Sequence, residues 1–430
     1  MTTKSMMRLF RQFWAAAGLA LGGLTHAGAA QDLARAQQNA TASAQPSATE
    51  PSRNYRFDRT ISREVLENYL SRAISMEGLF NGRGDLDDNI RMLTRIGAKY
   101  IGRSLCLWGA EADFLHNVQR AKVQAPKLLA HDPDMILEAC VFETVSPRVN
   151  QLEVPGWVFT GLGQPVEHRN FRYADMIYPE GQRRNWGPNA SVPDESRLET
   201  RLWFYYQAAS YIDAGFEAIH FGQVEIMNKN DPDNALWADL LSRVRVYAAA
   251  HARRHMVLCN GHVPSGGLMR HGRCLLDFHA FPLRIKEVAD QPQQAILKAG
   301  FSDALYGRSK GGQTFSGWTC EHLPYLVELD NWGVSQTPGQ AGAGGIWIWG
   351  YDEITWFAHQ NQEYRSRWLR YAWDWVRRTD PNGFLEMPGS RTLRSPLDDK
   401  RWYYANRPSA AVPTGFGDED AIRAIWLRAQ

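Results

Sequence analysis

Residues 217–231 read EAIHFGQVEIMNKND, and this stretch does most to decide the fold. Its first half interleaves branched and aromatic residues with glycine, which is typical of a strand in a core. The same stretch nevertheless ends on Gln223 and Glu225. Because side chains alternate along a strand, we expect these two residues to share a face with Phe221, and His220 to face the other way. A carboxylate ending a buried strand predicts a site at that end of a sheet.

The rest of the globular part alternates short apolar runs with longer helical patterns. Strand-like runs occur at residues 75–80, 100–108, 135–145, 217–227, 255–262, 275–282, 323–333 and 344–353. Strand-then-helix order predicts parallel pairing with crossovers, and a count of eight favours an α/β fold closed into a (β/α)8 TIM barrel. An open doubly wound sheet is the alternative, but such sheets normally carry a glycine-rich phosphate loop after an early strand, and we find none.

The chain divides by composition into four parts. Residues 1–30 combine early basic residues, a short apolar run and an A-x-A-like site, which predicts a secretory signal peptide. Residues 31–54 predict a disordered linker. Residues 55–380 would form a single barrel domain with a long loop insertion at 146–195, and residues 381–430 a C-terminal extension that packs on the barrel or is partly disordered. No cysteine stands near the cleavage site for lipid attachment, so we expect a periplasmic or secreted protein.

Charge and cysteine content exclude several classes of function. The net charge is +2, from 48 basic and 46 acidic residues, and no block of one sign stands out. Nucleic acid and anionic membranes are therefore poorly supported as partners. No membrane span is expected, because no apolar run reaches the length that a span requires. The oligomeric state stays open. Five cysteines without a CxxC pair indicate buried free thiols, and Cys259 with Cys274 is the one candidate pair for a disulfide. No cofactor and no metal ligands are assigned.

Catalytic groups of a parallel barrel gather where the strands end, because the following loops form one mouth. The polar and aromatic candidates at the expected strand ends, besides Gln223 and Glu225, are Arg103, Trp108, Glu143, Asp277, His279, Glu328, Asp330, Trp347 and Trp349. Trp157 and Trp186 lie in the long insertion. Aromatic rings suit the apolar faces of sugars, although they are equally good core material.

This arrangement resembles the TIM-barrel glycoside hydrolase superfamily, in which an acid/base glutamate ends strand four and a nucleophilic glutamate ends strand seven. Glu225 and Glu328 occupy those two positions, and PYLVE, from Pro324, is similar to the family's strand seven. Arg103 takes the place of the family's strand-two arginine, and Trp349 that of its strand-eight sugar platform.

The resemblance implies an exported enzyme that cleaves an oligo- or polysaccharide with Glu225 as acid/base and Glu328 as nucleophile, with retention favoured over inversion. The residues that would bind the sugar are Gln223, Arg103, Asp277, His279, Trp349, Trp347, Asp330 and Glu143. The chain departs from the family at Val224, where asparagine is usual, so that Gln223 would contact the 2-hydroxyl group or the mechanism would differ.

Two other classes of function remain open. His220, His262, Asp277, His279 and His322 are enough ligands for a metal-dependent hydrolase, although no HxH or HExxH motif occurs. A non-catalytic carbohydrate-binding or polysaccharide-assembly protein would keep the aromatic residues without a working carboxylate pair. Each strand-end carboxylate could also simply pair with a loop arginine, and Asp330 could take the role given to Glu328.

Overall fold

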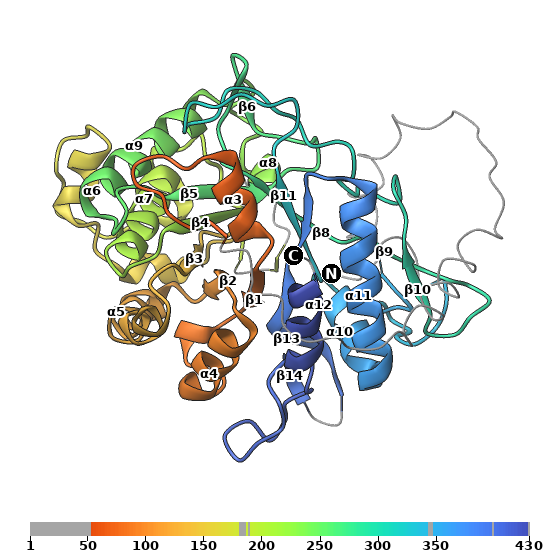
Figure 1. Cartoon of the computed structure of the whole chain (residues 1–430). Coiled ribbons are helices and arrows are strands. Elements are labelled where there is room, and N and C mark those ends of the chain that lie inside the picture. The colour runs from red at the N-terminus through yellow and green to blue at the C-terminus, as the bar shows by residue number, and fades with distance from the viewer. Residues whose placement is uncertain (1–52, 180–185, 188–189, 343–346, 398–399, 429–430) are drawn as a thin grey trace. The chain divides into compact units, whose positions relative to one another are not determined.

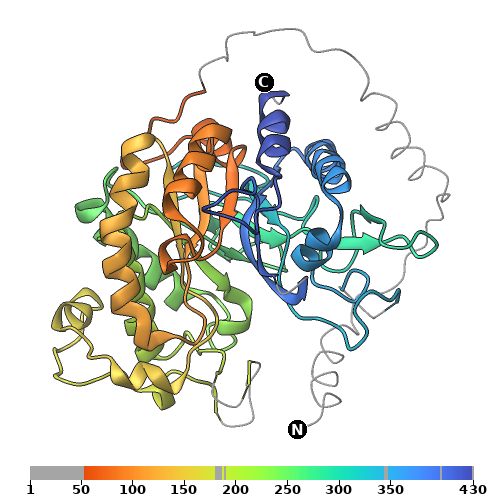
Figure 2. The ribbon, with the colours of Figure 1, turned by 90° about the horizontal axis from the view of Figure 1, so that it is seen from below.

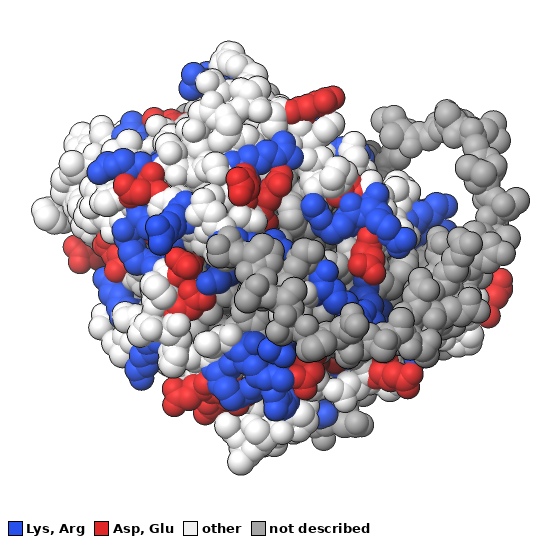
Figure 3. All heavy atoms as spheres, viewed as in Figure 1, with Lys and Arg blue, Asp and Glu red and all other residues white. Residues whose placement is uncertain are grey.

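A computed structural model describes residues 53–179, 186–187, 190–342, 347–397 and 400–428 (Figure 1). The predicted signal peptide at 1–30 and almost all of the predicted linker lie outside these residues. Within the described part, no helix has the length and apolar character that a membrane crossing requires. Acidic and basic side chains lie next to one another over the face seen in Figure 3.

One large sheet organises the described chain. Its strands, in spatial order, are β12 (Gly383–Leu385), β11 (Tyr325–Glu328), β8 (His279–Pro282), β5 (Leu258–His262), β4 (Ala218–Gln223), β3 (Ile136–Cys140), β2 (Tyr100–Leu105), β1 (Ala73–Met76), β13 (Met387–Leu397) and β14 (Lys400–Tyr404). All neighbours pair in parallel except β13 with β14. The chain is thus a mixed α/β fold built on a parallel sheet, as the sequence predicts.

Helices flank this sheet (Figures 1 and 2). They are α3 (Arg63–Leu70), α4 (Leu86–Ile96), α5 (Phe114–His131), α6 (Gly156–Gly161), α7 (Leu198–Ile212), α8 (Val224–Met227), α9 (Ala235–His251), α10 (Glu353–His359), α11 (Gln362–Thr379) and α12 (Glu419–Arg428). Single 3-10 turns are η2 (Leu79–Asn81), η3 (Glu111–Asp113), η4 (Pro147–Gln151) and η5 (Tyr173–Asp175), and short hairpin strands are β6 (Met269–Arg270), β7 (Arg273–Cys274), β9 (Ile285–Glu287) and β10 (Ala295–Leu297).

Helix α4 shows how local sequence sets these boundaries. The Asp85 side chain accepts a hydrogen bond from the Asp88 backbone N–H and so caps the first turn. Gly97 ends the helix with a φ of 74°, which glycine adopts without the steric cost of a side chain.

A compact apolar layer crosses the parallel strands near their amino ends. Its members are buried and come from, or directly precede, successive strands: Ala73, Tyr100, Ile136, Ala218, Leu258, Phe278, Leu326 and Phe384. Because side chains two apart share a face, the next residues on the same face are Ser75, Gly102, Glu138, His220, Asn260, Ala280, Glu328 and Glu386. These are also buried, so a largely polar layer lies directly beyond an apolar one, toward the carboxyl ends of the strands.

The expected eighth strand at 344–353 is wrong. Residues 343–346 lie outside the described part, residues 347–352 form a loop with one isolated bridge, and Glu353 already begins α10. The side chains of Trp347, Ile348 and Trp349 belong to this loop. Periodicity in the sequence does not by itself distinguish such a loop from a strand.

The last parallel strand instead lies in the region that we expected to be an extension, 381–430. There β12 pairs with β11 at one end of the sheet order, and β13 pairs with β1 near the other end. Only Glu386 separates the two segments, and its backbone N–H donates to the Val327 carbonyl at 2.8 Å. Residues 383–404 are therefore part of the sheet itself, and α12 packs against α4 and α11.

Candidate functional site

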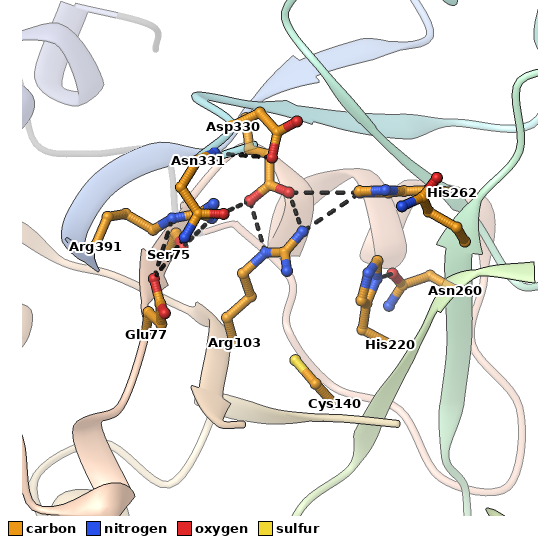
Figure 4. A network of polar contacts seen from close by, with 12 residues as sticks. Ser75, Glu77, Arg103, Cys140, His220, Asn260, His262, Asp330, Asn331 and Arg391 are labelled. Carbon is orange, nitrogen blue, oxygen red and sulfur yellow. Dashed lines mark hydrogen bonds and ion pairs between the residues drawn. The ribbon is translucent and has the colours of Figure 1, made fainter. Parts of the chain in front are cut away.

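Glu328, the last residue of β11, is the centre of a buried ionic network. Figure 4 labels Arg103, Arg391 and His262, which surround it. Arg103 from β2 donates from Nε to Glu328 Oε2 at 2.7 Å and from Nη2 to Oε1. Arg391 from β13 donates from Nη1 to Glu328 Oε2. The Nε2 atom of His262, which ends β5, lies 3.5 Å from Oε1. The structure thus brings the candidates Arg103 and Glu328 together, and it adds Arg391 and His262, to which the sequence analysis gave no place in this site.

The charge of Glu328 follows from these neighbours. Burial by itself would raise the pKa of its carboxyl group, because only 2% of the residue is exposed. The charges of Arg103 and Arg391 outweigh burial and hold the pKa well below its ordinary value. Glu328 is therefore a fixed anion, which suits an attacking or charge-stabilising role and not that of a proton donor.

Backbone irregularity aims Arg103 at this carboxylate, and a side-chain hydrogen bond holds Arg391. Arg103 has a φ of 52°, and the pairing of β2 with β3 shifts register between Ile101 and Leu105. The Arg103 backbone N–H donates to Glu138 Oε2 at 2.9 Å, which holds the turned backbone in place. Arg391 is similarly tied, because its Nη1 also lies 3.2 Å from Ser75 Oγ.

Two further carboxyl groups share the polar layer. Glu138 accepts from Tyr100 Oη and, at 2.6 Å, from Asn260 Nδ2, while burial raises its pKa. Glu386 also has a pKa raised well above normal, first by burial and then by the charges of Glu328 and Glu138. A Cβ atom on Gly102 would overlap Glu386 Oε1, so this position on β2 has room only for glycine. Within this layer the surrounding charges favour the ionised form of Glu328, whereas burial favours the protonated form of Glu386.

Gln223 at the end of β4 is hydrogen-bonded to Glu143, which follows β3. The Gln223 backbone N–H donates to Glu143 Oε2 at 3.0 Å, and its side-chain Nε2 donates to Oε1 at 2.8 Å. Gly222 between strand and turn has a φ of 55°, and a Cβ there would overlap Glu143 Oε2.

The expected orientation of the residues before Glu225 is wrong. Phe221 packs against Trp237 of α9, with ring centroids 5.7 Å apart, and so faces the helices. His220 faces the polar layer, where its Nδ1 lies 2.7 Å from Asn260 Oδ1. The alternation fails after Phe221 because Gly222 is left-handed and Val224 begins α8.

Glu225 consequently lies on the single turn of α8. Its Oε1 accepts the Ser265 backbone N–H at 3.0 Å, and it lines a shallow surface pocket with Asn228, Lys229 and Gly267. Among the contacts of the described residues, none joins Glu225 directly to Glu328. Glu225 and Glu328, the pair expected from the sequence, therefore have different partners in the structure.

Asp277 and His279 have partners outside the network. Asp277 Oδ2 accepts from Arg245 Nη2 and from the Cys259 backbone N–H, both at 2.8 Å, which ties β5 to α9. His279 Nδ1 lies 3.1 Å from Ser309 Oγ, and burial lowers its pKa to about 3, so the ring is neutral.

The candidates that follow β11 differ in burial. Asp330 is half-buried, with Oδ2 3.7 Å from Arg284 Nη1. Trp347 is also half-buried and stacks on Trp332 with ring centroids 6.0 Å apart. Trp349 is buried and donates from Nε1 to the Gln294 carbonyl, so it packs a loop and is not at a strand end.

An aromatic ledge, defined here as Trp108, Phe142 and Trp186, lies beside Arg103. Trp108 follows β2 and is 44% exposed, and its ring centroid is 5.4 Å from that of Phe142 and 5.0 Å from that of Trp186. Trp186 is fixed by donating from Nε1 to the Glu143 carbonyl at 2.8 Å. The other insertion tryptophan, Trp157, instead packs against Tyr205, Tyr206 and Tyr247 on α7 and α9.

The residues considered as metal ligands are divided among different sites. His220 and His262 meet with ring centroids 5.0 Å apart, whereas Asp277 and His279 are engaged as described, and His322 Nδ1 lies 2.7 Å from the Ser309 carbonyl. Within the part of the chain that the structure describes, no group of three or more His, Cys, Asp or Glu residues could hold a metal ion.

Sequence reasoning missed Arg391 and Glu386 because it placed their segment in an extension and not in the parallel sheet. The available signal was Phe384-Leu385-Glu386, an apolar run ending on a glutamate as Leu326-Val327-Glu328 does.

No protein-family model and no curated protein sequence matches the chain. Solved structures of glycoside hydrolases do match. A cyclic α-maltosyl-(1→6)-maltose hydrolase from Arthrobacter globiformis is 10% identical, with a TM-score of 0.45, over 84% of this chain and 83% of that one. An isomalto-dextranase from Arthrobacter globiformis T6 is 14% identical, with a TM-score of 0.32, over 61% of this chain and 46% of that one. An α-galactosidase of family GH36 from Geobacillus stearothermophilus is 15% identical, with a TM-score of 0.25, over 47% and 30%.

The chain therefore resembles glycoside hydrolases of known structure. All three TM-scores are below 0.5, so the proposals that follow rest on the residues of the site.

Proposed function

We propose that this chain is a glycoside hydrolase that cleaves an oligo- or polysaccharide at the carboxyl ends of its parallel strands. The observation that carries the proposal is Glu328, an anion fixed by Arg103 and Arg391 at the end of a parallel strand. Glycosidic cleavage passes through an oxocarbenium-like state, which a carboxylate of low pKa stabilises or attacks. The neighbouring aromatic ledge offers flat apolar surface to a sugar ring.

The scaffold that we propose is a closed (β/α)8 barrel in which β12, Glu386 and β13 act as one eighth strand. Three observations support closure: β12 pairs with β11, β13 pairs with β1, and one residue separates them. The apolar layer also draws one buried residue from each of the eight resulting strand positions. A closed barrel would place every strand end around one mouth.

Within this proposal Glu328 acts as the nucleophile and Glu225 as the acid/base of a retaining mechanism. Glu225 is half-buried in a surface pocket, which leaves it open to a leaving group. Retention requires the two carboxyl groups about 5 to 5.5 Å apart with substrate bound, whereas inversion requires about 6.5 to 9.5 Å. Asp330 is the alternative partner, because it is half-buried two residues beyond Glu328.

The test begins with a panel of 4-nitrophenyl α- and β-glycosides and a set of soluble polysaccharides, measured by nitrophenol and reducing-end release. Wild-type protein should act on at least one of them. Glu225→Gln should lower turnover by about 10² to 10⁴-fold, the usual contribution of an acid/base group. Glu328→Ala should be inactive, and added azide should restore product as a glycosyl azide.

Glu321→Gln is the matched control, because that side chain is 90% exposed, and it should behave as wild type. The proposal fails if the wild-type protein releases nothing from the whole panel, or if Glu328→Ala retains wild-type turnover.

Carbohydrate binding without catalysis is the second candidate. The observation that favours it is the burial of Glu328, which two arginines already neutralise. Polysaccharide in the gel would slow the migration of such a protein in affinity electrophoresis. The protein would release no sugar, and Glu225→Gln would not change its binding.

Export is part of the same proposal and is supported by the pattern at residues 1–30. Expression of the full chain in a Gram-negative host, followed by fractionation and N-terminal sequencing, should find a periplasmic or extracellular protein that begins after Ala30. Full-length protein confined to the cytoplasmic fraction would overturn this part.

A further inference from the structure

Two thiol groups meet directly beside the Arg103 backbone. Cys106 follows the last residue of β2 and Cys140 is the last residue of β3, and their Sγ atoms are 3.1 Å apart. The pairing of Leu105 with Ala139 explains this proximity, because it places the next residue of each strand side by side. Figure 4 shows Cys140 near His220 and Arg103.

The two sulfurs differ in access. Cys140 is completely buried, whereas Cys106 is partly exposed, so an oxidant in solution would reach Cys106 first. The Cys106 Sγ also lies 3.1 Å from the Arg103 carbonyl. A disulfide bond is about 2.0 Å long, so the sulfurs need to approach by only about 1 Å to be joined.

We propose that Cys106 and Cys140 form a disulfide bond that braces the ends of β2 and β3 beneath the Glu328 network. The oxidant is a disulfide, either glutathione disulfide or that of a thiol–disulfide oxidoreductase. The Cys106 thiolate attacks one sulfur of the oxidant and releases a first thiol. The Cys140 thiolate then attacks the Cys106 sulfur and releases a second. Two protons leave the protein thiols, two electrons pass to the oxidant, and one protein S–S bond replaces the S–S bond of the oxidant.

The burial of Cys140 fits this order of events. Burial raises the pKa of its thiol well above normal, and the neighbouring Cys106 raises it further. Cys140 is thus a poor first nucleophile in bulk solution but is held next to the sulfur that it must attack. Its position makes it the resolving residue.

The bond would act on the site through Arg103, a positioning residue in this respect. Arg103 lies between two pairs of the β2–β3 ladder, Ile101 with Leu137 and Leu105 with Ala139, in a backbone turned to positive φ. A bond from Cys106, just beyond this turn, to the end of β3 restricts the backbone that aims the Arg103 guanidinium at Glu328. This inference does not depend on the proposed function, because it concerns the state of two thiols.

The other cysteines provide internal controls. The sequence singled out Cys259 and Cys274; both are buried, and burial raises the pKa of each thiol to about 12. Cys259 lies on β5, in contact with the Asp277 carboxylate through its backbone N–H. No contact between these two sulfurs exists in the structure's described residues.

The experiment uses the full chain equilibrated with glutathione disulfide, denatured, alkylated with iodoacetamide and mapped by peptide mass spectrometry without reduction. The expected result is one linked peptide pair joining Cys106 to Cys140, with Cys259, Cys274 and Cys320 alkylated. Full alkylation of Cys106 and Cys140, or a link between other cysteines, overturns the proposal. Wild-type protein suffices for this test, so a misfolded variant does not obscure it.

A second measurement tests the bracing effect. Oxidised wild-type protein should unfold at a higher urea concentration than the same protein reduced with dithiothreitol, because the cross-link restricts the unfolded chain. Cys259→Ser should show the same difference between the two states, and Cys106→Ser should show none. Equal midpoints for oxidised and reduced wild-type protein would refute the bracing role.

Discussion

Replacing Glu328 with glutamine should destabilise the protein strongly, because it removes the carboxylate charge that two buried arginines share. Arg103 is 8% exposed and Arg391 is 1% exposed, so neither guanidinium can turn to water when its partner becomes neutral. Breaking a buried pair by neutralising one member costs about 3 to 5 kcal/mol. Total stability of a domain is about 5 to 15 kcal/mol, so the loss should be a large fraction of it.

Glu419→Gln is the comparison that isolates the burial of the arginines. The Glu419 side chain is also fully buried and bonded to Arg91 and Arg407, but those arginines are 39% and 47% exposed. They can recover water as a partner, so we expect a loss nearer that of one charge-assisted hydrogen bond, about 1.5 to 3 kcal/mol. Urea unfolding followed by tryptophan fluorescence at pH 7 measures both differences.

The pH dependence provides an independent check on Glu328. The pKa of Glu328 is lowered in the folded state. Its contribution to folding stability is therefore fully present above the unfolded-state pKa of about 4.3, and it is lost as pH falls through the folded-state pKa. The stability gap between wild type and Glu328→Gln should therefore stay constant from pH 8 to pH 5 and shrink only in stronger acid. A variant within about 0.5 kcal/mol of wild type at pH 7, within the range of an ordinary surface substitution, would refute the reasoning.

Three further substitutions follow from the structure. Trp108→Ala should weaken the affinity for polysaccharide, measured by affinity electrophoresis, about tenfold, the equivalent of about 1.4 kcal/mol. Trp157 is equally exposed but packs on α7 and α9, so Trp157→Ala should leave the affinity unchanged. Equal effects of the two substitutions would contradict a binding role for the aromatic ledge. Gly102→Ala should cost about 1 to 3 kcal/mol in urea unfolding because its Cβ overlaps Glu386, and Glu386→Ala in the same chain should recover part of the loss. Burial raises the pKa of Asp352 to about 7, so folding favours its protonated form, and this residue should lower wild-type stability as pH rises from about 4 to 7. Asp352→Asn should lack this pH-dependent loss of stability. A stability difference between the two proteins that does not change with pH would contradict the prediction.

The parallel scaffold could be predicted from the sequence because most of its strands are continuous apolar runs. The runs at 100–108 and 323–333 contain β2 and β11, and the polar residues that interrupt them include Arg103 and Glu328, which meet in the structure. For these strands, burial on both faces produces a pattern that period and composition can recognise.

The last parallel strand could not be recognised in the same way. Residues 387–391 contain Pro388, Gly389 and Arg391, none of which is typical of a central strand. Gly389 is required because a Cβ there would crowd Met76 and Ile74, and Arg391 is tolerated because Glu328 compensates its charge. The reasons for these residues lie in other strands, which a single segment of sequence does not reveal.

The directions of individual side chains near the carboxyl ends of the strands were harder to predict than the scaffold, because the strands become irregular there. Strict alternation holds in the buried halves of the strands, where the apolar and polar layers lie two residues apart. It fails nearer the carboxyl ends, because the ladders of β2 and β4 shift register after Ile101 and His220. Arg103 and Gly222, both at positive φ, occupy those irregular steps. The left-handed step at Gly222, which places Gln223 against Glu143, is therefore also the reason why a period of two counted back from Glu225 misassigns His220.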